Sequence, residues 1–196
     1  MALSLSRTRA LVLAGAVVVV AVTGCGSSDD DSSSTTPSTS DSGAPVFPVP
    51  EDTEAAIKRA GLVALPEETL EYHIHPELRI FIDDEKVKVP ENIGIDLQNQ
   101  RISPLHTHDD SGIIHVEAPE PVDFTLEQLF QEWDVGLDED CIATYCADDT
   151  HQFVTFVDDE RVPDPTEVVF EDEQQIVLWY GPKDVEPTIP STVPSE

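Results

Sequence analysis

The sequence predicts an α+β fold, in which a small mixed sheet is covered by one helix. Two observations support this. Several short runs alternate apolar and polar residues, as half-buried strands do, and one later run repeats its apolar residues at helical spacing. The predicted order is strands, one main helix and strands again, unlike the strand–helix alternation of a parallel α/β sheet. We therefore expect a single globular α+β domain at residues 51–185.

A short helix and a hairpin are expected first. Residues 51–60 (EDTEAAIKRA) fit a helix that Gly61 stops. Residues 70–82 alternate as a strand does, residues 83–85 (DDE) suit a turn, and residues 86–89 can return as a second strand. The residues of the first strand that would share its buried face are Ile74, Leu78, Ile80 and Ile82.

The main helix is expected after a short strand at residues 113–116. Thr125 can cap a helix at residues 125–133, and Gln128 stands three positions later, as in a capping box. Its apolar residues recur at spacings of three and four, so they form one stripe along the helix. This stripe consists of Leu126, Leu129, Phe130 and Trp133.

Three strands are expected after the helix. Residues 152–157 alternate with period two, residues 158–160 (DDE) turn the chain into a short strand at 161–162, and residues 175–180 form the last strand. Residues 113–180 therefore have the strand–helix–strand–strand order of half a β-grasp sheet, and we expect the helix to cover one face of that sheet.

The chain is strongly acidic, with 40 acidic and 10 basic residues among 196 and a formal net charge of −30. This balance argues against nucleic acid as a partner and against a polybasic hold on anionic lipid, since both need clustered Lys and Arg. Two explanations of the acidity stay open. One is solubility, and the other is adaptation to a salty habitat, where ions screen the repulsion between like charges.

The first 25 residues have the pattern of a bacterial lipoprotein signal. Two arginines precede an apolar run at residues 10–22, which is shorter than the ~20 residues of a membrane span. Val22-Thr23-Gly24-Cys25 resembles a lipobox. That resemblance implies removal of a signal peptide, residues 1–24, and lipid attachment to the sulfur of Cys25. We expect an extracytoplasmic protein that its lipid anchors to the bacterial cell membrane.

Two segments outside the domain are expected to lack packed structure. Residues 25–50 are mostly Ser, Thr, Asp and Pro, which cannot bury enough apolar surface to fold, so they would form a disordered tether. Residues 186–196 are Pro-rich and are expected to form an extended tail.

Five of the six histidines fall within residues 73–115, where they form two H-x-H pairs and one H-x-E motif. Side chains two apart on a strand point to the same face with Cα atoms about 6.5–7 Å apart, so both imidazoles of a pair can reach one ion. In the first pair, both histidines would face away from the apolar side of their strand. The motifs are His73-Ile74-His75, His106-Thr107-His108 and His115-Val116-Glu117.

These motifs predict a metal site formed by separate chain segments. Imidazole is a good ligand for Zn, Cu, Ni and Fe, and a carboxylate can complete the shell or accept an imidazole N–H. Binding should weaken below about pH 6, because a metal-bound imidazole must be neutral. The residues expected at the heart of the site are His106, His108 and His115, with His73 and His75 as further ligands. Asp109 and Glu117 are expected as carboxylate ligands or as acceptors of imidazole N–H groups.

The donor types narrow the choice of metal. Cu(I) carriers usually offer thioether or thiolate donors, and the chain has no methionine after Met1. The imidazole and carboxylate set suits Zn(II), Cu(II) or Ni(II). We expect Zn or Cu(II) as the bound ion, in a protein for capture, buffering or relay of metal at the envelope.

The same motifs carry a resemblance to a family of exported or membrane-anchored bacterial and archaeal proteins. The similarity spans residues 70–181. Family members often have Asn-Gly at the turn where this chain has Asp158-Asp159-Glu160. The family has no assigned activity, so the resemblance implies export and the importance of the motifs, and no reaction. The matching segments are residues 73–78 (HIHPEL), 89–95 (VPENIGI), 105–117 (LHTHDDSGIIHVE) and 124–126 (FTL), with Phe130 and Trp133.

Enzyme classes with similar motifs fit less well. Residues 106–111 (HTHDDS) nearly match the H-x-H-x-D-H of the metallo-β-lactamase fold, but Ser111 stands where the last histidine is needed. The domain is about half as long as an α-type carbonic anhydrase, and Glu117 lies too far after His108 for a cupin. We therefore assign no catalytic residue. A small metal-dependent hydrolase or hydratase, whose metal activates water, stays as an alternative.

The two remaining cysteines, Cys141 and Cys146, are expected to form a disulfide in an oxidising compartment. Their spacing does not match the C-x-x-C of redox or metal-binding thiol pairs. A third candidate function is an envelope interaction module that presents a sheet edge to a protein partner and needs no metal.

Overall fold

The computed structural model of the protein describes residues 38–39 and 43–187, and it confirms the predicted α+β fold class. These residues belong to one compact unit, Ser33–Glu196. The expected signal peptide, Cys25, most of the expected tether and the tail from residue 188 lie outside the described residues. Within the described ranges, no helix is long and apolar enough to cross a membrane.

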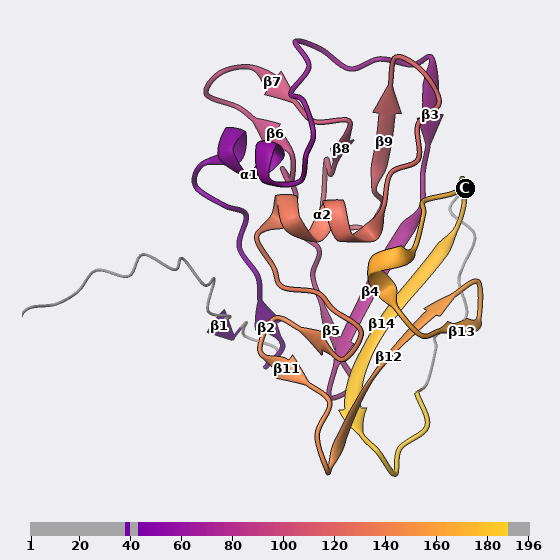
Figure 1. Ribbon diagram of the computed structural model, residues 1–196. Coiled ribbons are helices and arrows are strands. Elements are labelled where there is room, and N and C mark those ends of the chain that lie inside the picture. Colours follow the sequence, from indigo (N-terminus) through magenta and orange to yellow (C-terminus); the bar gives the residue numbers. More distant parts are fainter. Residues whose placement is uncertain (1–37, 40–42, 188–196) are drawn as a thin grey trace, which may run out of the picture. The chain divides into compact units, whose positions relative to one another are not determined.

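A five-stranded mixed sheet is formed by β4 (Glu77–Ile82), β5 (Glu85–Val87), β12 (His151–Val157), β13 (Glu160–Val162) and β14 (Gln175–Pro182). Its order is β13-β12-β14-β4-β5, with β4 and β14 parallel and the other neighbours antiparallel (Figure 1). A first hairpin whose leading strand lies parallel to the last strand is the β-grasp arrangement. The strand expected at residues 113–116 does not belong to this sheet, and β4 takes its place.

Both hairpins of this sheet turn at an Asp-Asp pair. The φ angles are 52° and 65° at Asp83-Asp84, and 49° and 66° at Asp158-Asp159. Two consecutive residues with positive φ are typical of the type I′ turn, whose twist matches that of the strands it joins. Both turns are at the predicted places, and they are tighter than expected because Glu85 and Glu160 already belong to the returning strands.

A three-stranded antiparallel sheet, in the order β3-β9-β8, is formed by β3 (Tyr72–Ile74), β8 (Leu105–His106) and β9 (His115–Ala118). The prediction of one strand at residues 70–82 is therefore wrong. Proline has no N–H for a ladder, and the chain changes sheets at Pro76, whose carbonyl accepts the Ile114 N–H at 2.9 Å. Figure 1 shows β3 leading down into β4. The predicted buried residues are confirmed as Ile74, Leu78, Ile80 and Ile82.

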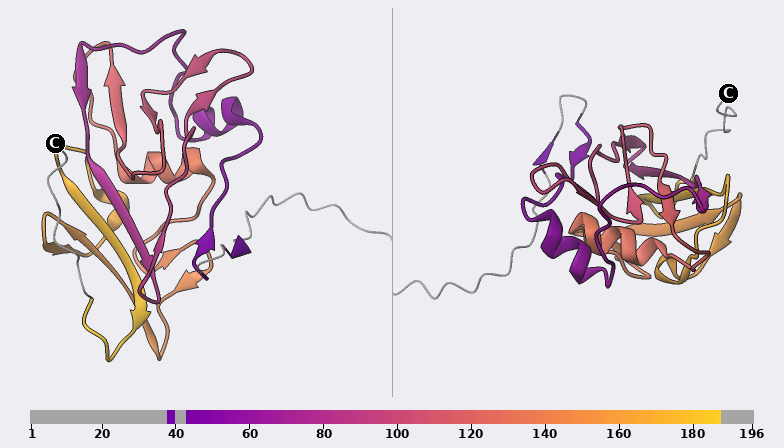
Figure 2. Two further views of the ribbon diagram at one scale, coloured as in Figure 1. Left: turned by 180° about the vertical axis from the view of Figure 1, so that it is seen from behind. Right: turned by 90° about the horizontal axis from the view of Figure 1, so that it is seen from above.

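The helices α1 (Thr53–Arg59) and α2 (Leu126–Trp133) pack against each other (Figure 2), and η1 (Pro165–Glu167) is a single 3₁₀ turn. The predicted capping box is present: the Gln128 N–H donates to Thr125 Oγ1 at 3.3 Å, and the Thr125 N–H donates to Gln128 Oε1 at 3.0 Å. The predicted stripe of α2 is buried and shares one hydrophobic core with the inward residues of β4 and β14. This core includes Leu126, Leu129, Phe130, Trp133, Leu78, Ile80, Ile176 and Leu178.

The packed structure begins before residue 51. Phe47 is 1% exposed, and its ring meets the Trp133 ring edge-on with centroids 6.0 Å apart. The Trp133 indole N–H donates to the Phe47 carbonyl at 3.1 Å. The expected tether therefore ends earlier than residue 50. The apolar residues that follow Gly43 pack against the domain, whereas the Ser- and Thr-rich sequence that precedes Gly43 has no apolar residues to pack. The first strands are β1 (Ser38–Thr39) and β2 (Pro45–Val46), which pair antiparallel.

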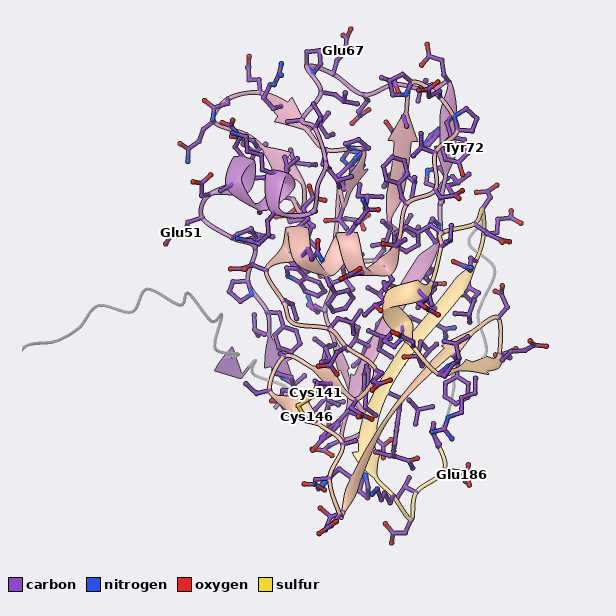
Figure 3. The ribbon with its side chains drawn as sticks, viewed as in Figure 1. Glu51, Glu67, Tyr72, Cys141, Cys146 and Glu186 are labelled. Carbon is purple, nitrogen blue, oxygen red and sulfur yellow. A yellow bond between two sulfur atoms is a disulfide. The ribbon has the colours of Figure 1, made fainter. Side chains whose placement is uncertain are left out.

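Cys141 and Cys146 form the predicted disulfide, seen as a yellow bond in Figure 3. It joins β10 (Cys141–Ile142) to β11 (Tyr145–Cys146), two short antiparallel strands. A second small hairpin consists of β6 (Ile95–Asp96) and β7 (Arg101–Ile102).

Replacing both cysteines by serine is expected to lower the free energy of unfolding by about 2 kcal/mol, because the bond closes a short loop in the unfolded chain. Urea unfolding of the wild type and the double variant measures this difference. Reductant should destabilise only the wild type. A difference below about 0.5 kcal/mol would contradict the prediction.

Candidate metal centre

The three-stranded sheet brings all five clustered histidines together. In its register His106 on β8 lies opposite His115 on β9, and Glu117 on β9 lies opposite His73 on β3. Because side chains two apart on a strand share a face, His115 and Glu117 point to the same side, and so do their partners. The two H-x-H motifs thus flank the central H-x-E motif on one face of the sheet.

His115 lies at the middle of this arrangement. Its ring centroid is 4.5 Å from that of His108 and 4.7 Å from that of His75, both edge-on. On its two flanks it stacks with His106 at 5.4 Å and with His73 at 6.2 Å. The histidine cluster, defined here as His73, His75, His106, His108 and His115, is therefore a single group around one central ring.

The cluster contains two triads that share His115. The β3 triad is His73, His75 and His115, and the β8 triad is His106, His108 and His115; a third donor set in the described chain is Glu68, His106 and Glu117. Within each set, one ligand atom per residue lies within 4.8 Å of the others. The ligands of a tetrahedral Zn(II) with bonds of 2.0–2.1 Å are about 3.3 Å apart, so modest side-chain rotations bring either triad onto an ion.

Three buried polar atoms in the cluster and on the adjacent Glu117 have no hydrogen-bond partner among the described residues. They are His106 Nε2, His115 Nδ1 and Glu117 Oε2. The His106 Nδ1 lies 2.9 Å from the Ser103 carbonyl oxygen. A carbonyl only accepts, so Nδ1 carries the proton and Nε2 keeps its lone pair. A buried polar atom without a partner costs about 1–3 kcal/mol, and a cation bound to such an atom would remove its cost.

The Glu117 carboxylate lies among these rings. Its Oε1 is 3.1 Å from His73 Nε2, 3.6 Å from His115 Nδ1 and 4.0 Å from His106 Nε2. The side chain is only 4% exposed, and burial raises the pKa of the carboxyl above its usual value. A carboxylate in this position suits the predicted role, either as a ligand or as an acceptor for an imidazole N–H.

Burial favours the neutral form of three histidines, His75, His106 and His115. The pKa of His106 is lowered to about 3, mainly by desolvation, which outweighs the raising effect of the Ser103 carbonyl, and that of His115 is lowered to about 4 by desolvation and by the neighbouring histidines. The pKa of His75 is lowered too, first by burial and then by the charge of His73. A neutral imidazole has a nitrogen lone pair for a metal, so these rings are ready to bind without first losing a proton.

These pKa values place the protonation of two proposed ligands, His106 and His115, below the pH 6 expected from ordinary histidines. Protonation of His106 and His115 opposes the metal only at about pH 4 and below, where affinity should fall by about tenfold per pH unit for each competing proton. Equilibrium dialysis with Zn(II) from pH 7 to pH 3 measures this, with circular dichroism to check folding at each pH. A fall in affinity that is complete by pH 5 would contradict it.

Two acidic residues have places at the site that differ from those expected from the sequence. Glu68, which no motif singled out, has its Oε1 3.3 Å from His108 Nε2 and belongs to the third donor set. Asp109 lies outside all three sets, and its Oδ1 accepts the Ser111 N–H at 2.9 Å. The Ser111 hydroxyl, and then this backbone bond, lower the pKa of Asp109, and its negative charge still faces His115 and His108.

The sixth histidine lies far from the cluster. His151 begins β12 opposite Pro182, at the end of β14, whereas the first residue of β14, Gln175, lies beside Glu77 below the cluster. Eight residues of extended strand span about 23 Å. His151 stacks on Tyr180 with centroids 5.1 Å apart, so it is a suitable control for substitutions in the cluster.

Comparison with known proteins found no matching family model, no matching curated protein and no matching solved structure.

Proposed function

We propose that this domain binds a transition-metal ion, Zn(II) or Cu(II), through the histidine cluster, and that it captures, buffers or relays that metal at the bacterial cell envelope. The observation that supports this best concerns three buried atoms on one face of the three-stranded sheet, two imidazole nitrogens and one carboxylate oxygen. None of them has a hydrogen-bond partner among the described residues. Donors of this kind suit a borderline metal ion better than a soft one.

Elemental analysis of the purified full chain tests the proposal directly. We expect about one equivalent of Zn or Cu after dialysis against either ion, and a thermal unfolding midpoint that rises on adding it. At a free-ion concentration of 100 times Kd, binding adds about 2.7 kcal/mol to stability. That is about 5–10 °C for a domain of this size. Less than a tenth of an equivalent, with no thermal shift, would end the proposal.

A second candidate is a small metal-dependent hydrolase or hydratase. It is favoured by Glu117, whose buried carboxyl with a raised pKa lies within 4.0 Å of three imidazoles, where it could accept a proton from a metal-bound water. Turnover that chelator removes and added metal restores would support the enzyme. If assays of ester hydrolysis and CO₂ hydration show no such turnover, metal binding without catalysis is the function that remains supported.

We further propose that Cys25 carries the lipid that holds the chain at the outer side of the cell membrane. Two or more acyl chains anchor a protein stably, whereas a sequence with 10 basic and 40 acidic residues is poorly suited to bind anionic lipid by charge. Replacing Cys25 by Ser is expected to move the protein from the membrane fraction to the soluble fraction of a bacterium that processes lipoproteins. The matched control is the double serine variant of Cys141 and Cys146, which should stay in the membrane fraction.

Mass spectrometry of the N-terminal peptide of the mature protein gives an independent reading. We expect a peptide that begins at Cys25 and carries the added mass of the lipid. An unmodified Cys25, or a Cys25→Ser variant that stays with the membrane, would contradict the lipid anchor and would leave the metal site untouched.

A further inference from the structure

The two triads of the histidine cluster share a ligand, and this sharing constrains how the metal is held. We infer that a single ion uses both triads in turn: it is taken up at the β3 triad and retained at the β8 triad, with His115 as the ligand common to both positions. The inference rests on the proposed metal-binding function and concerns what the ion does within the site.

Sharing His115 argues against two ions bound at once. A neutral imidazole has one nitrogen lone pair, so His115 can bind one ion at a time unless it also loses its second proton. Two divalent ions around one ring would also repel each other strongly. In the described chain, the carboxylates within the donor sets that could offset this repulsion are Glu68 and Glu117.

The β8 triad is the better place for retention. The His106 ring is fully buried, and its bond to the Ser103 carbonyl fixes both its orientation and its tautomer before any metal arrives. His106 also belongs to the donor set that includes Glu68 and Glu117, so an ion at this position has carboxylate ligands within reach.

The β3 triad is the better place for uptake. His73 has 32% of its side chain exposed, and its Nε2 contacts Glu117 Oε1 at 3.1 Å, a contact that competes with a metal for both partners. His75 is partly exposed. His108 of the β8 triad is also exposed, at 42% of its side chain, so the difference between the triads is His106. Without a ligand as buried and oriented as His106, an ion at the β3 triad is bound less tightly and exchanges faster.

Glu117 provides the path between the two positions. Its Oε1 lies within 4.0 Å of a nitrogen of His73, of His115 and of His106, so the carboxylate can hold the ion while one imidazole leaves and the next arrives. Each step exchanges a nitrogen donor of one flanking strand for a nitrogen donor of the other. The ion keeps its charge, and the transfer requires no oxidant or reductant.

Metal titration of the full chain and two double variants tests this inference. One variant is His73→Ala with His75→Ala, and the other is His106→Gln with His108→Ala, where Gln fills the buried His106 position. Zn(II) titration gives stoichiometry and Kd, stopped-flow mixing with Cu(II) gives the uptake rate, and electron paramagnetic resonance of Cu(II) reports the ligand set. His151→Ala is the control, and thermal unfolding confirms that each variant folds.

We expect one equivalent of Zn(II) in the wild type. The β3 variant should keep one equivalent with a Kd within about threefold and take up Cu(II) about tenfold more slowly. The β8 variant should also keep one equivalent, with uptake at the wild-type rate, a Kd about 10–100-fold weaker and a different Cu(II) spectrum.

Two equivalents in the wild type would overturn the inference and keep metal binding intact. Unchanged uptake in the β3 variant, or complete loss of binding in the β8 variant, would also overturn it, because the positions would then not act in turn. No binding by the wild type would instead overturn the proposed function itself.

Discussion

Replacing His115 by Ala is expected to weaken Zn(II) or Cu(II) binding by about 100-fold or more. His115 is the only residue of the described cluster that belongs to both triads, so its loss leaves two imidazoles in each. Loss of an outer-shell partner of a metal ligand already costs 10–100-fold in affinity, and loss of the ligand itself should cost more. The substitution also removes the buried His115 Nδ1, which lacks a hydrogen-bond partner among the described residues. Because no hydrogen bond is lost with this atom, its removal should not destabilise the metal-free domain.

The thermal shift gives the clearest measurement of this change. At a free-ion concentration 100 times the wild-type Kd, the wild type gains about 2.7 kcal/mol, whereas a variant with a 100-fold weaker Kd gains only about 0.4 kcal/mol. The metal-induced rise in the unfolding midpoint should fall from about 5–10 °C to about 1 °C. His151→Ala, a change at a histidine with 32% side-chain exposure, should keep the wild-type shift. A full shift in His115→Ala would show that the ion binds elsewhere.

Sequence patterns correctly predicted the parts of the fold that depend on interactions between residues close together in the sequence. The capping box of α2 depends on Thr125 and Gln128, three residues apart, and the stripe from Leu126 to Trp133 depends on helical spacing alone. The turns at Asp83 and Asp158 are equally local. The alternation within residues 70–82 was also visible, but the change of sheets at Pro76 was not. The contacts made there, the Ile114 N–H to the Pro76 carbonyl and the Glu77 N–H to the Gln174 carbonyl, join residues that are distant in sequence.

In the candidate site, too, local features could be predicted from the sequence and contacts between distant segments could not. Each H-x-H motif fixed the face of two histidines, because the strand period is two. That the motifs would meet depended on β9 lying between β3 and β8, which the spacing of the motifs does not contain. Glu68 could not be predicted for the same reason: it reaches His108 from a segment 40 residues earlier that carries no motif.

Glu132 was missed although its helix was predicted, because the apolar stripe of α2 gave no reason to place an acidic residue inside. It is fully buried on α2, and neither carboxyl oxygen has a hydrogen bond of normal geometry within the described structure. Burial raises the pKa of Glu132 to about 8, and the nearby Ser103 hydroxyl only partly offsets this. The carboxyl is thus a neutral acid in the folded protein at pH 7.

Glu132→Gln is therefore expected to stabilise the domain increasingly as the pH rises. In the unfolded chain the Glu132 carboxyl ionises near pH 4.5, while in the folded chain it stays protonated to about pH 8. The unfolded state then binds fewer protons, so the stability of the wild type falls with rising pH across this window. The total loss is on the order of 3–5 kcal/mol, from about 1.36 kcal/mol per unit of pKa difference. Glutamine has no charge to bury and avoids this loss.

Urea unfolding at pH 5 and pH 8.5 gives the free energy of unfolding of Glu132→Gln and of the wild type at each pH. The effect is the change, between the two pH values, in the difference between these two free energies. Any fixed cost of burying the glutamine amide is the same at both pH values and cancels. Glu127→Gln makes the same substitution on the exposed side of the same helix and should show a change below about 0.5 kcal/mol. If the Glu132→Gln difference grows by less than about 1 kcal/mol between the two pH values, the carboxyl is not held neutral. The interior beneath Ser103, whose carbonyl orients His106, would then be more polar than its packing indicates.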